Sequence, residues 1–154
     1  MEKLIFNDEM AKFFKQFKEH KIVSLATCEN NYPTARSISA IIFNENIYFQ
    51  TGINLLKYKQ IISNNNVAIS FDNVQIEGRA NIIGKPLDEK NKDIMEKYKK
   101  HYKASYNNYS HLPDEILIKI IITKVTIWKY DIKLKPYRIF IEKDNTYKEY
   151  IQLK

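Results

Sequence analysis

Two cationic residues, Arg36 and Lys57, are best placed in this sequence to hold an anion. Lys57 falls near the third position of a predicted helix, 55–63, where a cation opposes the helix macrodipole unless an anion lies in front of the helix. Free backbone N–H groups at that end of a helix also attract anions. Arg36 shares the strand parity of apolar Ile38, and an inward-leaning arginine requires a charged partner. The two cations therefore predict a site for a phosphate monoester, although the spacing alone does not identify the ligand.

Each cation also has a simpler interpretation. Lys57 can be an ordinary solvated helix lysine, and Arg36 can pair with Glu45 or Glu77. The case for a joint site comes from the chain between the two cations, because a predicted strand, 47–51, connects the element of Arg36 directly to the helix of Lys57. Hydroxyl groups accompany the two cations, on Ser37, Ser39 and Thr51.

The elements that must position these side chains are predicted from periodicity. Aromatic and apolar residues at i, i+3, i+4 and i+7 predict an amphipathic helix over 8–19, with Asp8 as its cap. Runs rich in β-branched and aromatic residues predict strands at 21–28, 34–43, 47–51, 67–71, 74–83, 120–130, 137–142 and 146–152. A turn is expected at 29–33, a two-residue hairpin turn at 72–73, and a bulge or close backbone approach at Gly78.

Two more helices interrupt the strands. The first is 55–63 with Asn54 as its N-cap, and the second is a polar helix at about 88–104, followed by a loop-like segment, 105–113. Strands in two clusters, with helices between them and no regular βαβ alternation, favour an antiparallel barrel over a doubly wound sheet. We expect one domain, 1–154, that is mainly β (α+β).

Composition narrows the class of protein. The chain has 154 residues, 44% of them hydrophobic and 28% charged, and it has no uninterrupted apolar segment for a membrane span or a secretory signal. We therefore expect a cytoplasmic protein. Cys28 is the single cysteine, so neither an intrachain disulfide nor a cysteine-rich metal site is expected. The three histidines are too separated for a preset metal triad, and no metal is expected.

The net charge of +7 raises the question of nucleic acid or an anionic membrane as a partner. Of the 25 cationic residues, 22 are lysines scattered along the chain, and only Arg36, Arg79 and Arg138 can form bidentate contacts. A solvated lysine surface explains this distribution better, so we expect neither partner.

Several short motifs occur in a characteristic order. They are P-x-x-R-x-I at 33–38, Y-F-x-T at 48–51, K-x-x-Q-I at 57–61, N-V-A-I-S-F at 66–71 and V-Q-I-E-G-R-A at 74–80. Their order and spacing resemble the FMN-binding split barrels of the pyridoxamine 5'-phosphate oxidase-like family. The resemblance extends over about residues 14–86 and covers the remainder by general layout.

This resemblance implies an antiparallel split β-barrel with flanking helices that binds FMN between the two chains of a homodimer. It places Arg36 and Lys57 on the phosphate, and Gln50 and Thr51 against the ring system and ribityl chain. Asn73 falls where the family's biosynthetic oxidases carry a glutamine near the flavin. The implied cofactor-binding residues are Arg36, Ser37, Ile38, Ser39, Gln50, Thr51, Leu56, Lys57, Asn73 and Trp128.

The sequence departs from the biosynthetic oxidases around the substrate. Leu56 stands where they have an arginine, Ile41 stands where they have a lysine, and their C-terminal tryptophan and arginine segment is not recognisable. The resemblance therefore implies an FMN-dependent oxidoreductase for an unknown small acceptor, with a nicotinamide cofactor as a candidate donor, rather than a pyridoxamine phosphate oxidase. A non-catalytic flavin- or haem-binding protein or sensor on the same barrel is the alternative.

Two aromatic features stay open. Trp128 either packs in the core, as an aromatic in a strand usually does, or flanks a flavin ring of the partner subunit. Tyr98, Tyr102 and Tyr106 form an i, i+4, i+8 stripe that is either a packing face or the lining of a haem or substrate cavity.

Overall fold

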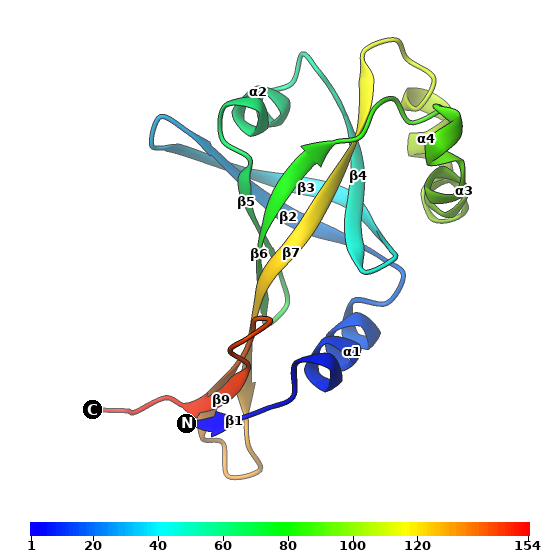
Figure 1. Cartoon of the computed structure of the whole chain (residues 1–154). Coiled ribbons are helices and arrows are strands. Elements are labelled where there is room, and N and C mark those ends of the chain that lie inside the picture. The colour runs from blue at the N-terminus through cyan, green and yellow to red at the C-terminus, as the bar shows by residue number, and fades with distance from the viewer.

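The computed structural model describes residues 1–154 and contains nine strands and four α-helices (Figure 1). The strands are β1 (Glu2–Lys3), β2 (His20–Glu29), β3 (Tyr32–Phe43), β4 (Asn46–Gly52), β5 (Asn66–Phe71), β6 (Val74–Ile82), β7 (Glu115–Tyr130), β8 (Pro136–Ile141) and β9 (Tyr147–Tyr150). The helices are α1 (Phe6–Phe17), α2 (Leu56–Ser63), α3 (Lys92–His101) and α4 (Lys103–Tyr109), with a 3-10 turn at Glu89–Asn91.

Six of the strands close into an antiparallel barrel. The strand order is β1-β9-β8-β7-β4-β3-β2-β5-β6, and an additional pairing of β6 with β7 closes the barrel. β8, β9 and β1 extend the sheet from β7 beyond the barrel (Figure 1). The predicted fold class, a mainly β split barrel with flanking helices, is therefore confirmed.

The barrel interior is one apolar core of 22 buried residues, to which α1 contributes. Phe13 and Phe17 of α1 are fully buried, and the ring of Phe17 meets that of Phe71 edge-on with centroids 5.2 Å apart. The aromatic face predicted for this helix thus packs on the barrel. In Figure 1, α1 and α2 lie toward opposite ends of the barrel, and Ile61 of α2 belongs to the same core.

A second, smaller core lies between α3 and the outer face of β3, β4 and β7. Its buried members are Ile41, Tyr48, Ile94, Met95, Tyr98 and Leu117, with Tyr102 and Tyr106 packed against them. The tyrosine stripe is therefore a packing face, as one of its two interpretations predicts. None of the helices has the length and the apolar run that crossing a bilayer requires.

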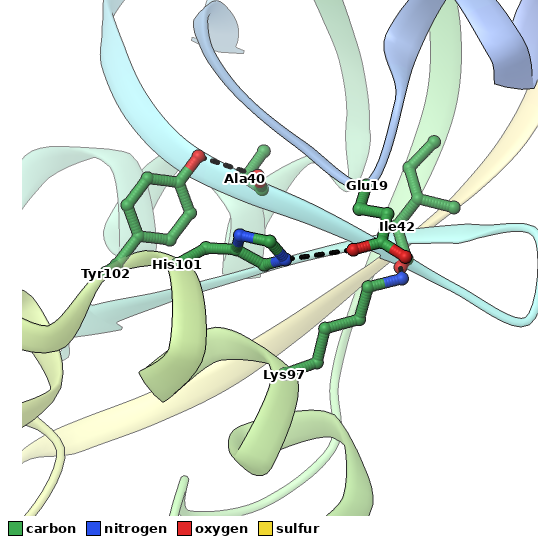
Figure 2. Close-up of polar contacts among 6 residues, drawn as sticks. All are labelled: Glu19, Ala40, Ile42, Lys97, His101 and Tyr102. Atoms are coloured by element: carbon green, nitrogen blue, oxygen red, sulfur yellow. Dashed lines mark hydrogen bonds and ion pairs between the residues drawn. The ribbon is translucent and has the colours of Figure 1, made fainter.

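Polar contacts hold α3 on the barrel (Figure 2). Lys97 Nζ donates to the carbonyl oxygen of Ile42 at 2.5 Å, and Tyr102 donates its hydroxyl proton to the carbonyl oxygen of Ala40 at 2.9 Å. His101 lies 3.1 Å from a carboxylate oxygen of Glu19. These contacts join α3 and the residue that follows it to β3 and to Glu19, the residue before β2, which explains why this excursion between β6 and β7 stays against the sheet.

Some predicted boundaries and caps are wrong. Ile5 and Leu55 occupy the N-cap positions of α1 and α2, and neither helix has a side-chain cap hydrogen bond. Neither Asp8 nor Asn54 is therefore a cap. The predicted helix 88–104 is divided into the 3-10 turn and α3, and α4 occupies part of the segment predicted as a loop. β7 begins five residues before the predicted 120, because its first residues pair with β4.

Gly78 lies at the predicted bulge. The β6–β7 register shifts between Glu77 and Gly78, and a Cβ added at Gly78 would lie 2.7 Å from the carbonyl oxygen of Ile121. Only a glycine leaves room for this close approach of two backbones, so the prediction is confirmed.

Candidate functional site

Arg36 lies on β3, where its guanidinium is held by three neutral oxygens. Nη1 donates to the carbonyl oxygen of Leu25 at 3.2 Å and to Thr27 Oγ1 at 2.7 Å. Nη2 donates to Thr34 Oγ1. Burial lowers the pKa of Arg36 from its ordinary value. The hydrogen bonds fix the orientation of the guanidinium without neutralising its charge.

Neither glutamate considered from the sequence pairs with Arg36. The ion pairs of the chain are Glu9–Lys12, Lys21–Asp72, Glu19–His101 and Arg138–Glu149. The pairing of Arg36 with Glu45 or Glu77 is therefore wrong. A partly buried guanidinium bonded only to neutral groups keeps a positive charge that favours an anion nearby.

Lys57 lies at the second residue of α2 and is half-buried. Burial, and after it the positive charge of Arg36, lowers the pKa of Lys57, while the carboxylate of Glu115 opposes this shift. Arg36 and Lys57, 21 positions apart in the sequence, thus lie within electrostatic reach of each other. This is the juxtaposition on which the sequence-based hypothesis depends.

Glu115 is a site residue that the sequence analysis missed. It opens β7 opposite Gly52, is only 7% exposed, and has an oxygen 3.6 Å from the position of a Cβ on Gly52. It forms none of the ion pairs, and burial raises its pKa while the charge of Lys57 opposes the shift. The missed signal was the strand itself, since the sequence does not decide between a helical and an extended piece before residue 120.

Thr51 lies at the end of β4 and is only 3% exposed. Its Oγ1 is buried without a hydrogen-bond partner, and the only other such side-chain atom is Arg138 Nε. Buried hydroxyls are almost always satisfied. The unpartnered hydroxyl therefore marks a place where a bound group can complete the hydrogen bonding.

Gln60, which the K-x-x-Q spacing contains, lies one helical turn after Lys57 and is 1% exposed. Its Oε1 accepts from Thr27 Oγ1 at 2.5 Å and from Thr34 Oγ1 at 2.6 Å. Its Nε2 donates to the carbonyl oxygen of Tyr32 at 3.0 Å. Gln60 thus joins α2 to the two threonines that hold Arg36.

The other predicted residues on β3 and β4 lie on both faces of the sheet. Ile38 points into the barrel core, whereas Ser37 is exposed and Ser39 is half-buried on the outer side. Leu56, at the start of α2, is 50% exposed. Gln50 lies on the outer side and is held by the α4 region: its Nε2 is 3.2 Å from both oxygens of Ser105, and its Oε1 accepts from Ser110 at 2.6 Å.

Asn73 and Trp128 lie together, away from the cations. Asn73 Nδ2 donates to the carbonyl oxygen of Trp128 at 2.7 Å. Trp128 is 48% exposed, with the guanidinium of Arg138 5.2 Å from its ring, so its assignment to the core is wrong. It lies 13 positions along β7 from Glu115, a span of roughly 40 Å of extended strand. Within one chain, Trp128 and Lys57 cannot contact the same small ligand.

Comparisons with known proteins agree with this architecture. A family model described as pyridoxamine 5'-phosphate oxidase matches residues 6–129. No curated protein matches the sequence.

Solved structures resemble the fold at low sequence identity. General Stress Protein 26 from Bacillus anthracis has a TM-score of 0.58 at 20% identity, over 97% of this chain and 100% of that one. PhzG from Burkholderia lata, in complex with tetrahydrophenazine-1-carboxylic acid, has a TM-score of 0.63 at 10% identity, over 96% and 92%. The haem storage protein HutZ from Vibrio cholerae has a TM-score of 0.60 at 14% identity, over 77% and 91%. The chain spans only half the length of the similar protein Atu2129 from Agrobacterium tumefaciens.

Proposed function

The chain belongs to the pyridoxamine 5'-phosphate oxidase family, and on that premise we propose that it is a flavoprotein that binds FMN through the phosphate. The observation that carries the proposal is the juxtaposition of Arg36 and Lys57, two partly buried cations within electrostatic reach and without an ion-pair partner. A phosphate bearing up to two negative charges matches this pair.

The unpartnered Thr51 hydroxyl supports the fit of a cofactor. Thr51 lies on β4, the strand that follows the strand of Arg36 and precedes the helix of Lys57 in the sequence. Its unpartnered hydroxyl suits a group that extends from the phosphate. Glu115 limits what this site accepts, because its buried carboxylate interacts electrostatically with the same lysine. It repels a second anion and so disfavours ligands with more negative charge than one phosphate carries.

The second group of predicted residues supports a homodimer. Trp128 is too far along β7 to contact a ligand held by Lys57 of the same chain, and Asn73, in the turn between β5 and β6, is hydrogen-bonded to it. A second copy can bring its own Asn73 and Trp128 to that ligand. Trp128 already presents an exposed ring. In this proposal each FMN lies at the subunit interface, and a chain prevented from dimerising binds FMN weakly.

Bound FMN would supply electron transfer, and the chain's own residues would hold the phosphate and cover the ring. We propose an oxidoreductase that acts on a small acceptor. The direct test is the absorption spectrum of the purified protein, followed by titration of added FMN and riboflavin. A colourless protein that leaves FMN fluorescence unchanged would contradict the proposal.

The likeness to HutZ supports haem binding as a second candidate. Titration with haem distinguishes the two cofactors by the absorption bands that develop. Rapid anaerobic reduction of the FMN-loaded protein by NADH or NADPH supports the enzyme. Indifference to both nicotinamides favours a binding protein or another electron donor.

As the pH rises, FMN affinity should begin to decrease at a lower pH than the one at which an ordinary lysine loses its proton. Burial and Arg36 favour the neutral form of Lys57, so its pKa lies below the usual value, and the cation is lost as the pH rises through that pKa. Bound phosphate favours the charged form, so FMN binding should take up a proton in this alkaline range. The measurement is the FMN dissociation constant against pH, with riboflavin as the phosphate-free control.

Lys57→Arg supplies the matched variant, because arginine keeps its charge throughout this range. It should bind FMN without the alkaline decrease. The same decrease in Lys57→Arg would assign the titration to another group.

A further inference from the structure

Two threonine hydroxyls lie between the guanidinium of Arg36 and the amide of Gln60, and their protons can be assigned. A guanidinium only donates hydrogen bonds, so the hydroxyls of Thr27 and Thr34 must accept from it. Each hydroxyl has one proton, and each oxygen lies 2.5–2.6 Å from Gln60 Oε1. Both protons therefore point to that oxygen, and the Gln60 amide group is oriented by donating to Tyr32.

The hydrogen bonds of Arg36 leave one edge of its guanidinium without a partner. Of its five N–H groups, those on Nη1 go to Leu25 and Thr27, and one on Nη2 goes to Thr34. The Thr27 and Thr34 oxygens lie 3.5 Å apart, which matches the two adjacent N–H groups between Nη1 and Nη2, so the Nε–H group and the outer Nη2–H group remain side by side on one edge of the plane. Nε has no partner and is not sealed from solvent, because the buried side-chain atoms without a partner are Thr51 Oγ1 and Arg138 Nε.

We propose that Gln60 is a positioning residue: its carbonyl oxygen directs both threonine hydroxyls, which lock Arg36 with its Nε–Nη2 edge free for bidentate binding of a phosphate. That edge matches two oxygens of one phosphate group. The identity of the ligand as FMN rests on the proposed function, but the locking of Arg36 does not.

Gln60 also fixes the position of Lys57 relative to Arg36. It lies three residues after Lys57 on α2, so both side chains share one side of the helix. The hydrogen bonds of Gln60 to β2 and β3 fix this helix against the strand of Arg36. Loss of the contact therefore frees Arg36 and also relaxes the position of Lys57.

The first test is NMR of the arginine side chains in the ligand-free protein. The chain has three arginines, so the Arg36 Nε–H signal is identified by its absence in Arg36→Lys. We expect slow rotation of the Arg36 guanidinium in the wild type and fast rotation in Gln60→Leu. Inorganic phosphate should shift the Arg36 Nε–H signal in the wild type and shift it much less in Gln60→Leu.

The second test compares FMN with riboflavin, which differ by the phosphate. Gln60→Leu should reduce the ratio of FMN to riboflavin affinity by roughly tenfold. Ile61→Val is the control, because Ile61 is buried on the same helix and its apolar side chain forms none of the hydrogen bonds of the network. It should lower the melting temperature while leaving the ratio unchanged. A purely structural role for Gln60 would give the control's result.

Gln60→Glu keeps the proposal testable if Gln60→Leu does not fold. It retains an oxygen for both threonines, so rotation of Arg36 should stay slow, while the added negative charge should weaken FMN binding. Fast rotation of Arg36 in the wild type, or an unchanged affinity ratio in Gln60→Leu, would overturn the proposal. If Arg36 behaves as expected with inorganic phosphate but the wild type does not bind FMN, the flavin assignment is wrong and the positioning role stands.

Discussion

Replacing Arg36 with alanine should weaken FMN binding by about 1.5 to 3 kcal/mol, or roughly 10- to 150-fold in the dissociation constant. The expected loss comes from charge-assisted hydrogen bonds between the guanidinium and the phosphate. Lys57→Ala should lose a similar amount, because its ammonium neutralises the same group. The measurement is fluorescence titration of FMN, with circular dichroism to show that the fold is retained.

Matched controls exist for both substitutions. Arg79 and Lys59 are exposed residues of β6 and α2 outside the cation pair, so Arg79→Ala and Lys59→Ala should leave FMN affinity nearly unchanged. Riboflavin affinity should change little in all four variants, since riboflavin lacks the phosphate. Unchanged FMN affinity in both Arg36→Ala and Lys57→Ala would refute the assignment of the phosphate site.

The largest effect on stability is expected for Phe17→Ala, which should lower the free energy of unfolding by about 3 to 5 kcal/mol. Phe17 is fully buried at the contact of α1 with the barrel, edge-on to Phe71 and 6.1 Å from the ring of Phe13. Removal of its ring leaves a cavity that the closed barrel cannot collapse to fill. Urea denaturation followed by circular dichroism measures the change.

Phe14→Ala serves as the comparison for Phe17→Ala. Phe14 lies on the same helix but is only partly buried against the core, so its loss should be clearly smaller. Because neither residue touches the cation pair, both variants should bind FMN with wild-type affinity under conditions where they are folded. Equal losses for the two variants would show that α1 contributes through helix formation rather than through this contact.

Local chemistry made several elements predictable. The turn between β2 and β3 follows from its asparagines, since Asn30 and Asn31 adopt the positive φ values of 49° and 61° that asparagine tolerates. The amphipathic pattern of α1 predicted its buried aromatic face, and Gly78 predicted the bulge. Arg36 and Lys57 could be paired because one short strand joins their elements, so little tertiary information was required.

The residues that the prediction missed are joined by contacts distant in the sequence. Gln60 meets Thr27 across 33 positions, and Glu115 faces Gly52 only because β7 pairs with β4. The predicted start of β7 was wrong for the same reason, because pairing with β4 rather than local preference sets it. No periodicity within β7 or α2 indicates these partners.

The sequence by itself therefore determined most of the barrel strands, the buried face of α1, the barrel class and the two cations, because hydrophobic period, turn residues and residue chemistry act over a few neighbouring positions. Only the tertiary structure decided that Gln50 contacts the α4 region, that Arg36 has no acidic partner, and that Trp128 lies far from Lys57. Those facts depend on strand pairing and barrel closure, which bring together atoms that the sequence order leaves apart.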